Sequence, residues 1–373
     1  MNRPGIAAYT IIVVLLAAVC MFALNSALQP VAAPLRKVLI IGDGRTETWP
    51  SMTAGARAAA LQFGLDVCFE RPKPGDSCND QSRLLSELDL SPFAGVAVSP
   101  VNPDTQCDQI NDLAGRTNLV TFGKDCDKSR RLCHVGYYQN GTGRMVAHIV
   151  HQTLQPGDQI ALLHISDTAN SDVRERLEGF RAAWEEWDVG HPSGEVSIVE
   201  VLIDSRNETQ ASQDLARAVQ NPRLATVIAF DQSASELVAD TLAQTVHSNL
   251  PNVIAFEPTA KVLDAIESGR VSFTVYNDPY RQGYEVVERL SMYCTGDETA
   301  LPVPGHGSSA LFGEIVDKHN LAEFRRRTGR LPESARVTAA QARTSTLSLD
   351  VESLIPMTLG EILHLPFVAS VFE

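Results

Sequence analysis

Apolar and polar residues alternate along most of the chain in a pattern that predicts short strands separated by helices. Runs of β-branched residues and leucine recur, and a longer segment with apolar residues at helical spacing follows most of them. The predicted strands lie at 37–42, 65–70, 95–99, 119–122, 133–136, 159–165, 195–203, 226–230, 253–256 and 272–276. The predicted helices lie at 49–62, 80–88, 104–114, 143–154, 172–187, 208–220, 233–247, 260–268 and 280–294.

This alternation predicts an α/β fold made of parallel βαβ units. About ten such units are too many for one open sheet of ordinary size, so two doubly wound, Rossmann-like domains are expected. The length of 373 residues is sufficient for two domains, each with its own core. The alternation ends near residue 301, and residues 315–324 are expected to hold one last strand and a turn. We assign no function to the apolar stretch 354–372.

The N-terminal 35 residues contain the longest apolar run of the chain. No charged side chain lies between Arg3 and Arg36, and residues 6–28 are almost continuously apolar. This length matches the roughly 20 residues that a helix needs to cross a bilayer. We favour an uncleaved transmembrane anchor over a cleaved signal peptide, because the run exceeds a usual signal core and no clean cleavage site follows. Both alternatives predict an exported protein, either anchored at the extracytoplasmic face of the cytoplasmic membrane or free in the periplasm.

Charge and composition exclude several classes of protein. Apolar residues make up 44% of the chain and charged residues 20%, which is typical of globular proteins. The net charge is −14, and no segment gathers a large cluster of lysine and arginine. Nucleic-acid binding is therefore not expected, because neutralisation of phosphates supplies most of the affinity for DNA and RNA.

Cysteine usage agrees with export. An even number of cysteines in an exported chain indicates disulfides, and proximity in sequence favours Cys68–Cys78 and Cys126–Cys133. Buried free thiols are the alternative, since cysteine is common in protein cores. Zinc binding is not expected, because no cysteines occur in pairs at the spacing of zinc ligands. The six cysteines beyond the apolar run are Cys68, Cys78, Cys107, Cys126, Cys133 and Cys294.

Motifs of enzymes are weak or absent in the sequence. Residues 42–44 read Gly-Asp-Gly after the first strand, but the third glycine of a dinucleotide-binding fingerprint is missing. Neither a Gly-x-Ser-x-Gly elbow nor a His-Glu-x-x-His motif occurs. His148 and His151 share a helix face without an evident third metal ligand. We therefore assign no catalytic residue, metal or cofactor, and keep an exported enzyme on an α/β scaffold as the alternative.

Three segments of the second half carry a family resemblance. Residues 172–181 read Asp-Val-Arg-Glu-Arg-Leu-Glu-Gly-Phe-Arg, and Asp231 follows a strand directly. Residues 254–283 contain an acid after a strand, an Ala-Ile-x-x-Gly-x-Val turn, and an asparagine before Asp-Pro-x-x-x-Gly. In order and spacing, residues 36–321 resemble the ribose-type periplasmic sugar-binding proteins, which share a fold with the effector domains of lactose-repressor-type regulators. A regulator is excluded here, because the apolar run stands where a helix-turn-helix is needed.

The resemblance implies a periplasmic binding protein type I fold, in which two Rossmann-like lobes are joined by a hinge of several strands. Residues 36–136 with 279–302 would form the N-terminal lobe, and residues 137–278 with 303–325 the C-terminal lobe. Residues 1–35 would be the membrane anchor. Residues 326–373 would be a tail of unknown role.

The resemblance also implies a ligand site at the carboxyl ends of the strands, where open α/β sheets bind ligands. Trp49 would stack on the apolar face of a sugar, and Arg174 would present a planar fork to two adjacent hydroxyl groups or to a carboxylate. Asp231 and Glu257 would accept hydrogen bonds from hydroxyl groups. The full set of expected ligand-binding residues is Trp49, Lys124, Tyr138, Arg174, Asp231, Glu257 and Asn277. Arg176 is expected to lie off this face and to pair with Glu175 or Asp172 at the surface.

Each of these residues also has an ordinary structural interpretation. Trp49 could pack in a core, Asp231 and Glu257 could cap helices, and Arg174 could form a surface salt bridge. Their common place at strand ends favours binding.

The function implied is that of a membrane-anchored solute-binding protein, which clamps a sugar or polyol and presents it to an ABC-type permease or a membrane sensor. Differences from the family at 45–48, 138–139 and 231–232 favour another sugar, a polyol or a sugar-like signal over ribose. A receptor domain for a non-sugar solute is a further alternative.

Overall fold

The computed structural model describes residues 35–44, 48–72, 78–165, 171–190, 196–203, 208–245, 250–296 and 307–329. Nearly all of the expected membrane anchor and of the expected tail lies outside these residues. Across the described ranges, no helix is both long enough and apolar enough to span a bilayer.

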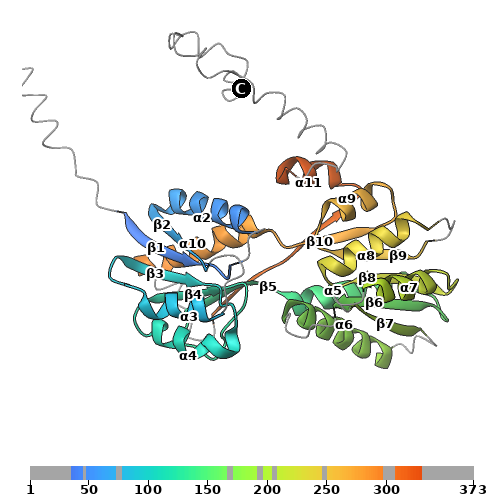
Figure 1. The fold of residues 1–373 in the computed structure, drawn as a ribbon, viewed down its shortest axis with the longest axis horizontal. Coiled ribbons are helices and arrows are strands. Elements are labelled where there is room, and N and C mark those ends of the chain that lie inside the picture. Colours follow the sequence, from blue (N-terminus) through green and yellow to red (C-terminus); the bar gives the residue numbers. More distant parts are fainter. Residues whose placement is uncertain are drawn as a thin grey trace, which may run out of the picture. The chain divides into compact units, whose positions relative to one another are not determined.

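The described chain forms two compact units (Figure 1). The first contains the residues up to Phe122, together with Cys126–Cys133 and Gly283–Gly307. The second contains Gly123–Asp125, His134–Gln282 and the described residues from Ser308 onward. The chain therefore passes between the units near residues 122–134, and again at 282–283 and 307–308.

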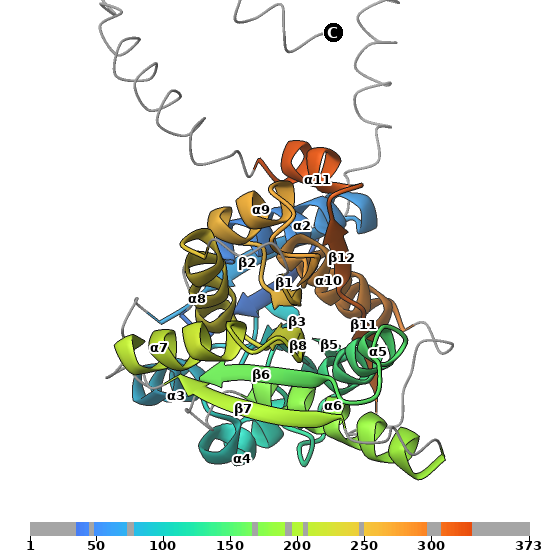
Figure 2. The ribbon, with the colours of Figure 1, turned by 90° about the vertical axis from the view of Figure 1, so that its right-hand side faces the viewer.

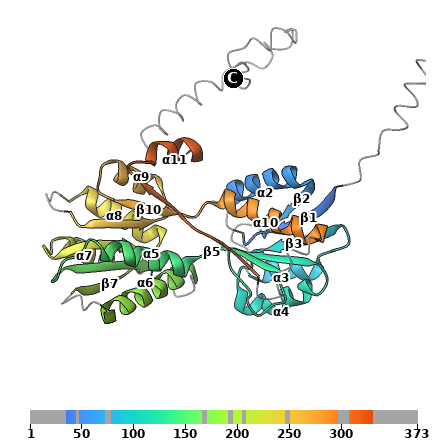
Figure 3. The same ribbon diagram turned by 180° about the vertical axis from the view of Figure 1, so that it is seen from behind.

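The first sheet has six strands in the order β11-β5-β4-β3-β1-β2. Its strands are β1 (Arg36–Ile41), β2 (Leu65–Glu70), β3 (Phe93–Val98), β4 (Asn118–Phe122), β5 (Cys133–Tyr137) and β11 (Ser308–Leu311). The helices of this half are α2 (Trp49–Phe63), α3 (Cys78–Glu87), α4 (Pro103–Ala114) and α10 (Pro279–Thr295). Figure 3 shows α2 and α10 on one face of the sheet, and α3 and α4 on the other.

The second sheet has six strands in the order β12-β10-β9-β8-β6-β7. Its strands are β6 (Gln159–Ile165), β7 (Ser197–Ile203), β8 (Leu224–Ala229), β9 (Asn252–Phe256), β10 (Phe273–Tyr276) and β12 (Glu314–Asp317). All neighbours pair in parallel except β12, which runs antiparallel to β10. The helices are α5 (Gln139–His151), α6 (Ser171–Gly190), α7 (Glu208–Val219), α8 (Gln232–Ala243), α9 (Ala260–Glu267) and α11 (Leu321–Thr328).

Alternate residues of the second sheet enter two different cores, as the pleat of a strand requires. Ala161, Leu163 and Val227 pack with α7, α8 and α9, whereas Ile160 and Ile228 pack with α5 and α6. Figure 2 shows the pair α5 and α6 on its own side of the sheet. Because both faces are covered by helices, the strands are apolar along most of their length.

Helices α5 and α6 approach each other closely through glycine. A Cβ atom on Gly143 would lie 2.0 Å from the carbonyl oxygen of Arg176, and one on Gly179 would lie 2.0 Å from that of Asn140. Only glycine lets two helix backbones come this near. The contact also explains why α5 begins at Gln139, four residues before the predicted start at 143, although Gly141 and Gly143 disfavour helix.

The sequence predicted the elements well, with two exceptions near residues 301–328. Each predicted strand and helix is present, with its ends shifted by a few residues. Strand β11 was not predicted, and the turn expected within 315–324 is instead helix α11, after strand β12. Tertiary contacts hold this helix, because Arg325 forms ion pairs with Asp264 at 2.5 Å and with Glu267 at 2.6 Å on α9.

The disulfide prediction is wrong for the structure as described, in which none of the six cysteines beyond the apolar run forms a disulfide. Cys78 Sγ lies 3.4 Å from the hydroxyl of Thr105, whereas Cys68 packs on the core under α3 and α4. Cys126 is buried in that same core. The sulfur atoms of Cys78 and Cys126 are therefore directed to Thr105 and to the carbonyl of Pro103, and not to the cysteines expected to pair with them.

We expect that Gly179→Ala lowers the free energy of unfolding by about 1–3 kcal/mol, because the added methyl group forces the backbones of α5 and α6 apart. Urea unfolding followed by the fluorescence of Trp184, on the same helix, measures this change. The control is Gly115→Ala, since the nearest atom to a Cβ there is the flexible end of Arg130 at 3.2 Å. Equal midpoints for the two variants would contradict the close contact.

Candidate functional site

The carboxyl ends of the five parallel strands of the second sheet lie along one border of the sheet, which we call its edge. Polar side chains gather there. Asp231 follows β8, Glu257 follows β9 and Asn277 follows β10. The first turns of α6, which carry Arg174 and Arg176, come after β6. Four of the expected ligand-binding residues therefore belong to segments that follow strands at this edge.

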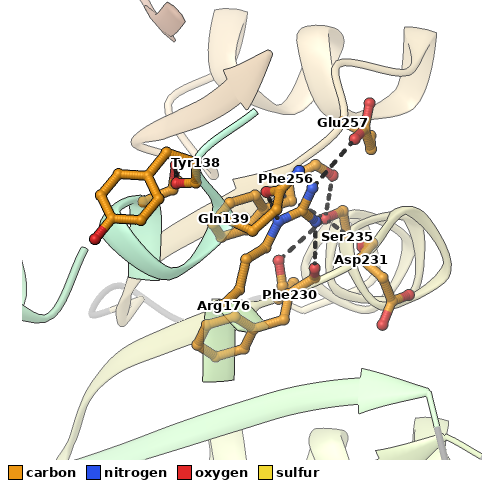
Figure 4. Close-up of polar contacts among 10 residues, drawn as sticks. Tyr138, Gln139, Arg176, Phe230, Asp231, Ser235, Phe256 and Glu257 are labelled. Carbon is orange, nitrogen blue, oxygen red and sulfur yellow. Dashed lines mark hydrogen bonds and ion pairs between the residues drawn. The ribbon is translucent and has the colours of Figure 1, made fainter. Parts of the chain in front are cut away.

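Arg176 is the centre of this edge (Figure 4). Its side chain is 3% exposed, and its guanidinium donates from Nε to Gln139 Oε1 at 2.7 Å and from Nη1 to the carbonyl oxygen of Phe230 at 2.9 Å. Nη2 lies 3.8 Å from Oε1 of Glu257, and the guanidinium carbon lies 4.6 Å from the centre of the Phe256 ring. One side chain thus joins the ends of β8 and β9 to the start of α5.

The two arginines of the 172–181 segment lie in different environments. Arg174 is 57% exposed and lies 4.0 Å from Glu178 on the same helix. The expectation that Arg176 pairs at the surface is wrong, because Arg176 is buried. Between the two arginines, burial raises the pKa of the Glu175 carboxyl, and the nearby carboxylate of Asp172 raises it further.

The periodicity of α6 contained a signal for the burial of Arg176. Val173, Leu177 and Phe180 form the buried stripe of this helix, and Arg176 lies within that stripe, three residues after Val173. A charged residue in an apolar stripe indicates a buried ion with partners. Gln139 and Ser235, which are also buried and polar here, gave no such signal.

Glu257 has a backbone conformation that is unusual for a residue with a side chain. Its φ angle is 67°, in the left-handed region, which costs on the order of 1–3 kcal/mol for a residue other than glycine. The N–H of Glu257 donates to the carbonyl of Val275 at 3.2 Å, and its own carbonyl accepts from the N–H of Thr259 at 2.9 Å. The side chain is 37% exposed. The surrounding backbone thus holds this carboxylate at the end of β9.

Asp231 is buried and caps helix α8, where it accepts a hydrogen bond from the N–H of Ala234 at 2.9 Å. Ser235, one turn into the helix, is fully buried. Its Oγ lies 2.8 Å from the carbonyl oxygen of Asp231 and 2.7 Å from that of Phe256, and it accepts from the N–H of Phe256 at 2.9 Å. Ser235 therefore ties the residue before Glu257 to the cap of α8.

Tyr138 and Asn277 also follow strands: Tyr138 comes after β5 of the first sheet, and Asn277 after β10 of the second. The ring of Tyr138 is directed away from Arg176 in Figure 4, is 47% exposed, and meets the ring of Phe312 edge to face at 6.2 Å. Oδ1 of Asn277 is shielded from solvent, and the described residues offer it no hydrogen-bond partner. Beside them, burial raises the pKa of the Tyr137 hydroxyl, which donates to the carbonyl of Asp278 at 2.9 Å.

In the first unit, Trp49 opens helix α2 and packs directly on Gly42 at the end of β1. A Cβ atom on Gly42 would lie 2.4 Å from the indole ring, so glycine is required there. The ring meets Phe69 edge to face at 6.0 Å, and the guanidinium of Arg71 lies 5.7 Å from its centre. Trp49 is only partly buried. An aromatic side chain is thus fixed at the carboxyl end of the first sheet.

Gln81, a fully buried residue of α3, holds the neighbouring strand ends together. Its Nε2 donates to the carbonyls of Gly42 and Ser99, both at 2.8 Å, and its Oε1 accepts from the N–H of Val101 at 2.8 Å. Gln81 was not among the residues expected from the sequence. Lys124 lies in the loop after β4 and is partly buried.

The residue types at the two edges fit recognition of hydroxyl groups. Carboxylates accept from hydroxyl groups, guanidinium groups donate to them, and indole covers an apolar sugar face. The described residues contain no cluster of three or more histidine, cysteine, aspartate or glutamate side chains able to hold a metal ion.

Comparison with known families identifies this architecture. Residues 38–298 match the model of the periplasmic binding protein domain. The chain belongs to the periplasmic binding protein family. Membership places it among binding proteins and not among enzymes, as the sequence motifs predicted. No curated protein matches the sequence.

Several solved structures share the fold. A solute-binding protein of an ABC transporter from Burkholderia graminis, in complex with D-arabinose, is 18% identical with a TM-score of 0.61, over 77% of this chain and 96% of that one. A sugar-binding protein from Bacillus halodurans is 19% identical with a TM-score of 0.65, over 77% and 99%. The XylFII–LytSN complex matches with 18% identity and a TM-score of 0.58, over 77% and 99%.

We expect that Ser235→Ala lowers the free energy of unfolding by about 1–3 kcal/mol, because the buried N–H of Phe256 loses its acceptor. Chemical unfolding of the ligand-free protein measures the loss. Ser86→Ala is the matched control, since Ser86 is exposed and bonds only within its own helix, to the carbonyl of Arg83. If Ser235→Ala unfolds at the same denaturant concentration as the control, Ser235 does not tie α8 to β9.

Proposed function

We propose that this periplasmic binding protein binds a sugar or polyol, and that Asp231 and Glu257 accept hydrogen bonds from its hydroxyl groups. The observation that carries the proposal is the pair of acids that follow β8 and β9. Glu257 lies 3.8 Å from the buried guanidinium of Arg176, and Ser235 ties Asp231 to the residue before Glu257. Hydrogen bonds that involve a charged group contribute about 1.5–3 kcal/mol each. Two such acceptors therefore give a neutral polyhydroxyl ligand both affinity and orientation.

Trp49 would supply the apolar part of the site. Its ring is fixed by Gly42, Phe69 and Arg71, so stacking on a ligand would cost little side-chain entropy. Arg174, Lys124, Tyr138 and Asn277 would complete the contacts. The exposure of Arg174 supports this role, because its weak surface pair with Glu178 can be exchanged for a ligand at small cost.

Binding would work by closure of one lobe on the other. The chain passes between the units near residues 122–134, 282–283 and 307–308, which supports a hinge of several segments. A ligand that contacts both lobes in the closed state gains contacts that the open state lacks, so it shifts the population toward closure. The closed form would then be recognised by an ABC-type permease or by a membrane sensor. The XylFII–LytSN complex and the sugar transporter protein of Bacillus halodurans support these two kinds of partner.

We expect that a sugar raises the melting temperature of the protein from Arg36 onward, because a ligand of the folded state stabilises it. The measurement is a thermal-shift screen with D-arabinose, D-xylose, D-glucose, D-galactose and their polyols, followed by calorimetric titration.

Glu257→Ala should raise the Kd of the best ligand about tenfold or more, since it removes a charged acceptor. Glu323→Ala is the control, because Glu323 is 75% exposed on α11. If amino acids stabilise the protein and no sugar or polyol does, the ligand class is wrong.

The apolar residues 6–28 would anchor the protein to the cytoplasmic membrane. The full chain should therefore remain in the membrane fraction after a carbonate wash, and detergent should release it. The chain from Arg36 onward, given a cleavable secretion signal, should be soluble in the periplasm. A full chain that is shortened at its N-terminus and soluble in the periplasm would instead identify the segment as a cleaved signal peptide.

A further inference from the structure

The burial of Arg176 requires a compensating acid. Transfer of an ion from water into a protein interior costs several kcal/mol, and neutral hydrogen-bond acceptors offset only part of this cost. Gln139 and the carbonyl of Phe230 are neutral acceptors. Among the residues that the structure describes, Glu257 is the one carboxylate within 4.0 Å of this guanidinium. The charge of Arg176 therefore acts mainly on Glu257.

Arg176 is poorly placed to contact a ligand itself. Its side chain is 3% exposed, and its Nε and Nη1 groups are already engaged. Glu257 differs, because it is 37% exposed and its carboxylate meets both Arg176 and solvent. An interaction between Arg176 and a ligand would therefore have to pass through Glu257.

The backbone of Glu257 makes this dependence stronger. A residue with φ near 67° is held by its surroundings and not by its own preference. The ring of Phe256, the preceding residue, lies against the guanidinium of Arg176, and Ser235 binds both the N–H and the carbonyl of Phe256. Removal of the guanidinium would therefore take away the ion-pair partner of Glu257 and also a packing contact of the Phe256 ring.

We propose that Arg176 is a positioning residue for ligand binding, which orients the carboxylate of Glu257 toward a ligand hydroxyl group without touching the ligand. The proposal rests on the proposed function, because Glu257 must be a ligand acceptor. A positioning role differs from a purely structural role in one measurable respect. The effect of Arg176 on the affinity for the ligand then depends on the carboxylate at position 257.

A double-mutant cycle tests this dependence, since such a cycle isolates the coupling between two residues. The variants are Arg176→Lys, Arg176→Met, Glu257→Gln and the two doubles, and the control is Arg181→Met. Arg181 lies on the same helix and pairs with Glu200 at the surface. The ligand is whichever of D-arabinose, D-xylose, D-glucose and D-galactose binds the unsubstituted protein best, and calorimetry gives Kd while thermal unfolding gives Tm.

Arg176→Lys and Arg176→Met should each raise Kd about tenfold or more in the normal background, and by less than about threefold when Glu257→Gln is present. Lysine retains the charge but cannot bridge three partners, so it should restore only part of the affinity. Arg181→Met should leave Kd unchanged. If Arg176→Met does not fold, Arg176→Lys allows the same comparison of Kd between the normal and the Glu257→Gln backgrounds.

Two results would overturn the proposal in distinguishable ways. An equal rise in Kd in both backgrounds, with a matching fall in Tm, would show that Arg176 only supports the fold. No binding of any of the four sugars by the unsubstituted protein would overturn the proposed function, and the positioning role with it.

Discussion

The arrangement of the second unit depends on one buried guanidinium. Arg176 lies in the apolar stripe of α6, and its donors reach the start of α5 and the end of β8. If any one of these partners moved away, the buried charge of Arg176 would lack a hydrogen bond in a low-dielectric interior. The start of α5 and the end of β8 are therefore held in one arrangement. The loops that follow parallel strands are otherwise the least constrained part of an α/β fold. A single side chain thus links the ends of β8 and β9 to the start of α5.

Glycine makes this interaction possible. The backbone of α5 touches the carbonyl of Arg176 itself, because Gly143 has no Cβ atom. The short distance between the helices lets Gln139 on α5 reach the guanidinium at 2.7 Å. Helix packing and the hydrogen bonding of Arg176 are therefore coupled. Gly143 has no functional side chain, but it sets the distance between the helices at which Gln139 can accept a hydrogen bond from the guanidinium.

The sequence predicted the parallel sheets and the strand-end positions of Asp231 and Glu257, because strands that are buried on both faces have a distinct apolar pattern. It did not predict which arginine of the Arg-Glu-Arg segment is buried, since burial depends on the approach of α5, a helix more than twenty residues earlier in the chain. The disulfide prediction was wrong for a related reason. Proximity in sequence says nothing of the direction of a side chain, and Cys78 faces Thr105 on the next helix.

At position 257, the backbone conformation favours one residue type and the side-chain chemistry favours another. Glycine adopts this conformation without steric cost, so the fold alone would favour glycine there. Glycine has no carboxylate to balance the buried arginine, nor one to accept from a ligand as the proposed function requires. The glutamate at position 257 is therefore a case in which the chain gives up some intrinsic stability for a chemical group that only this site requires.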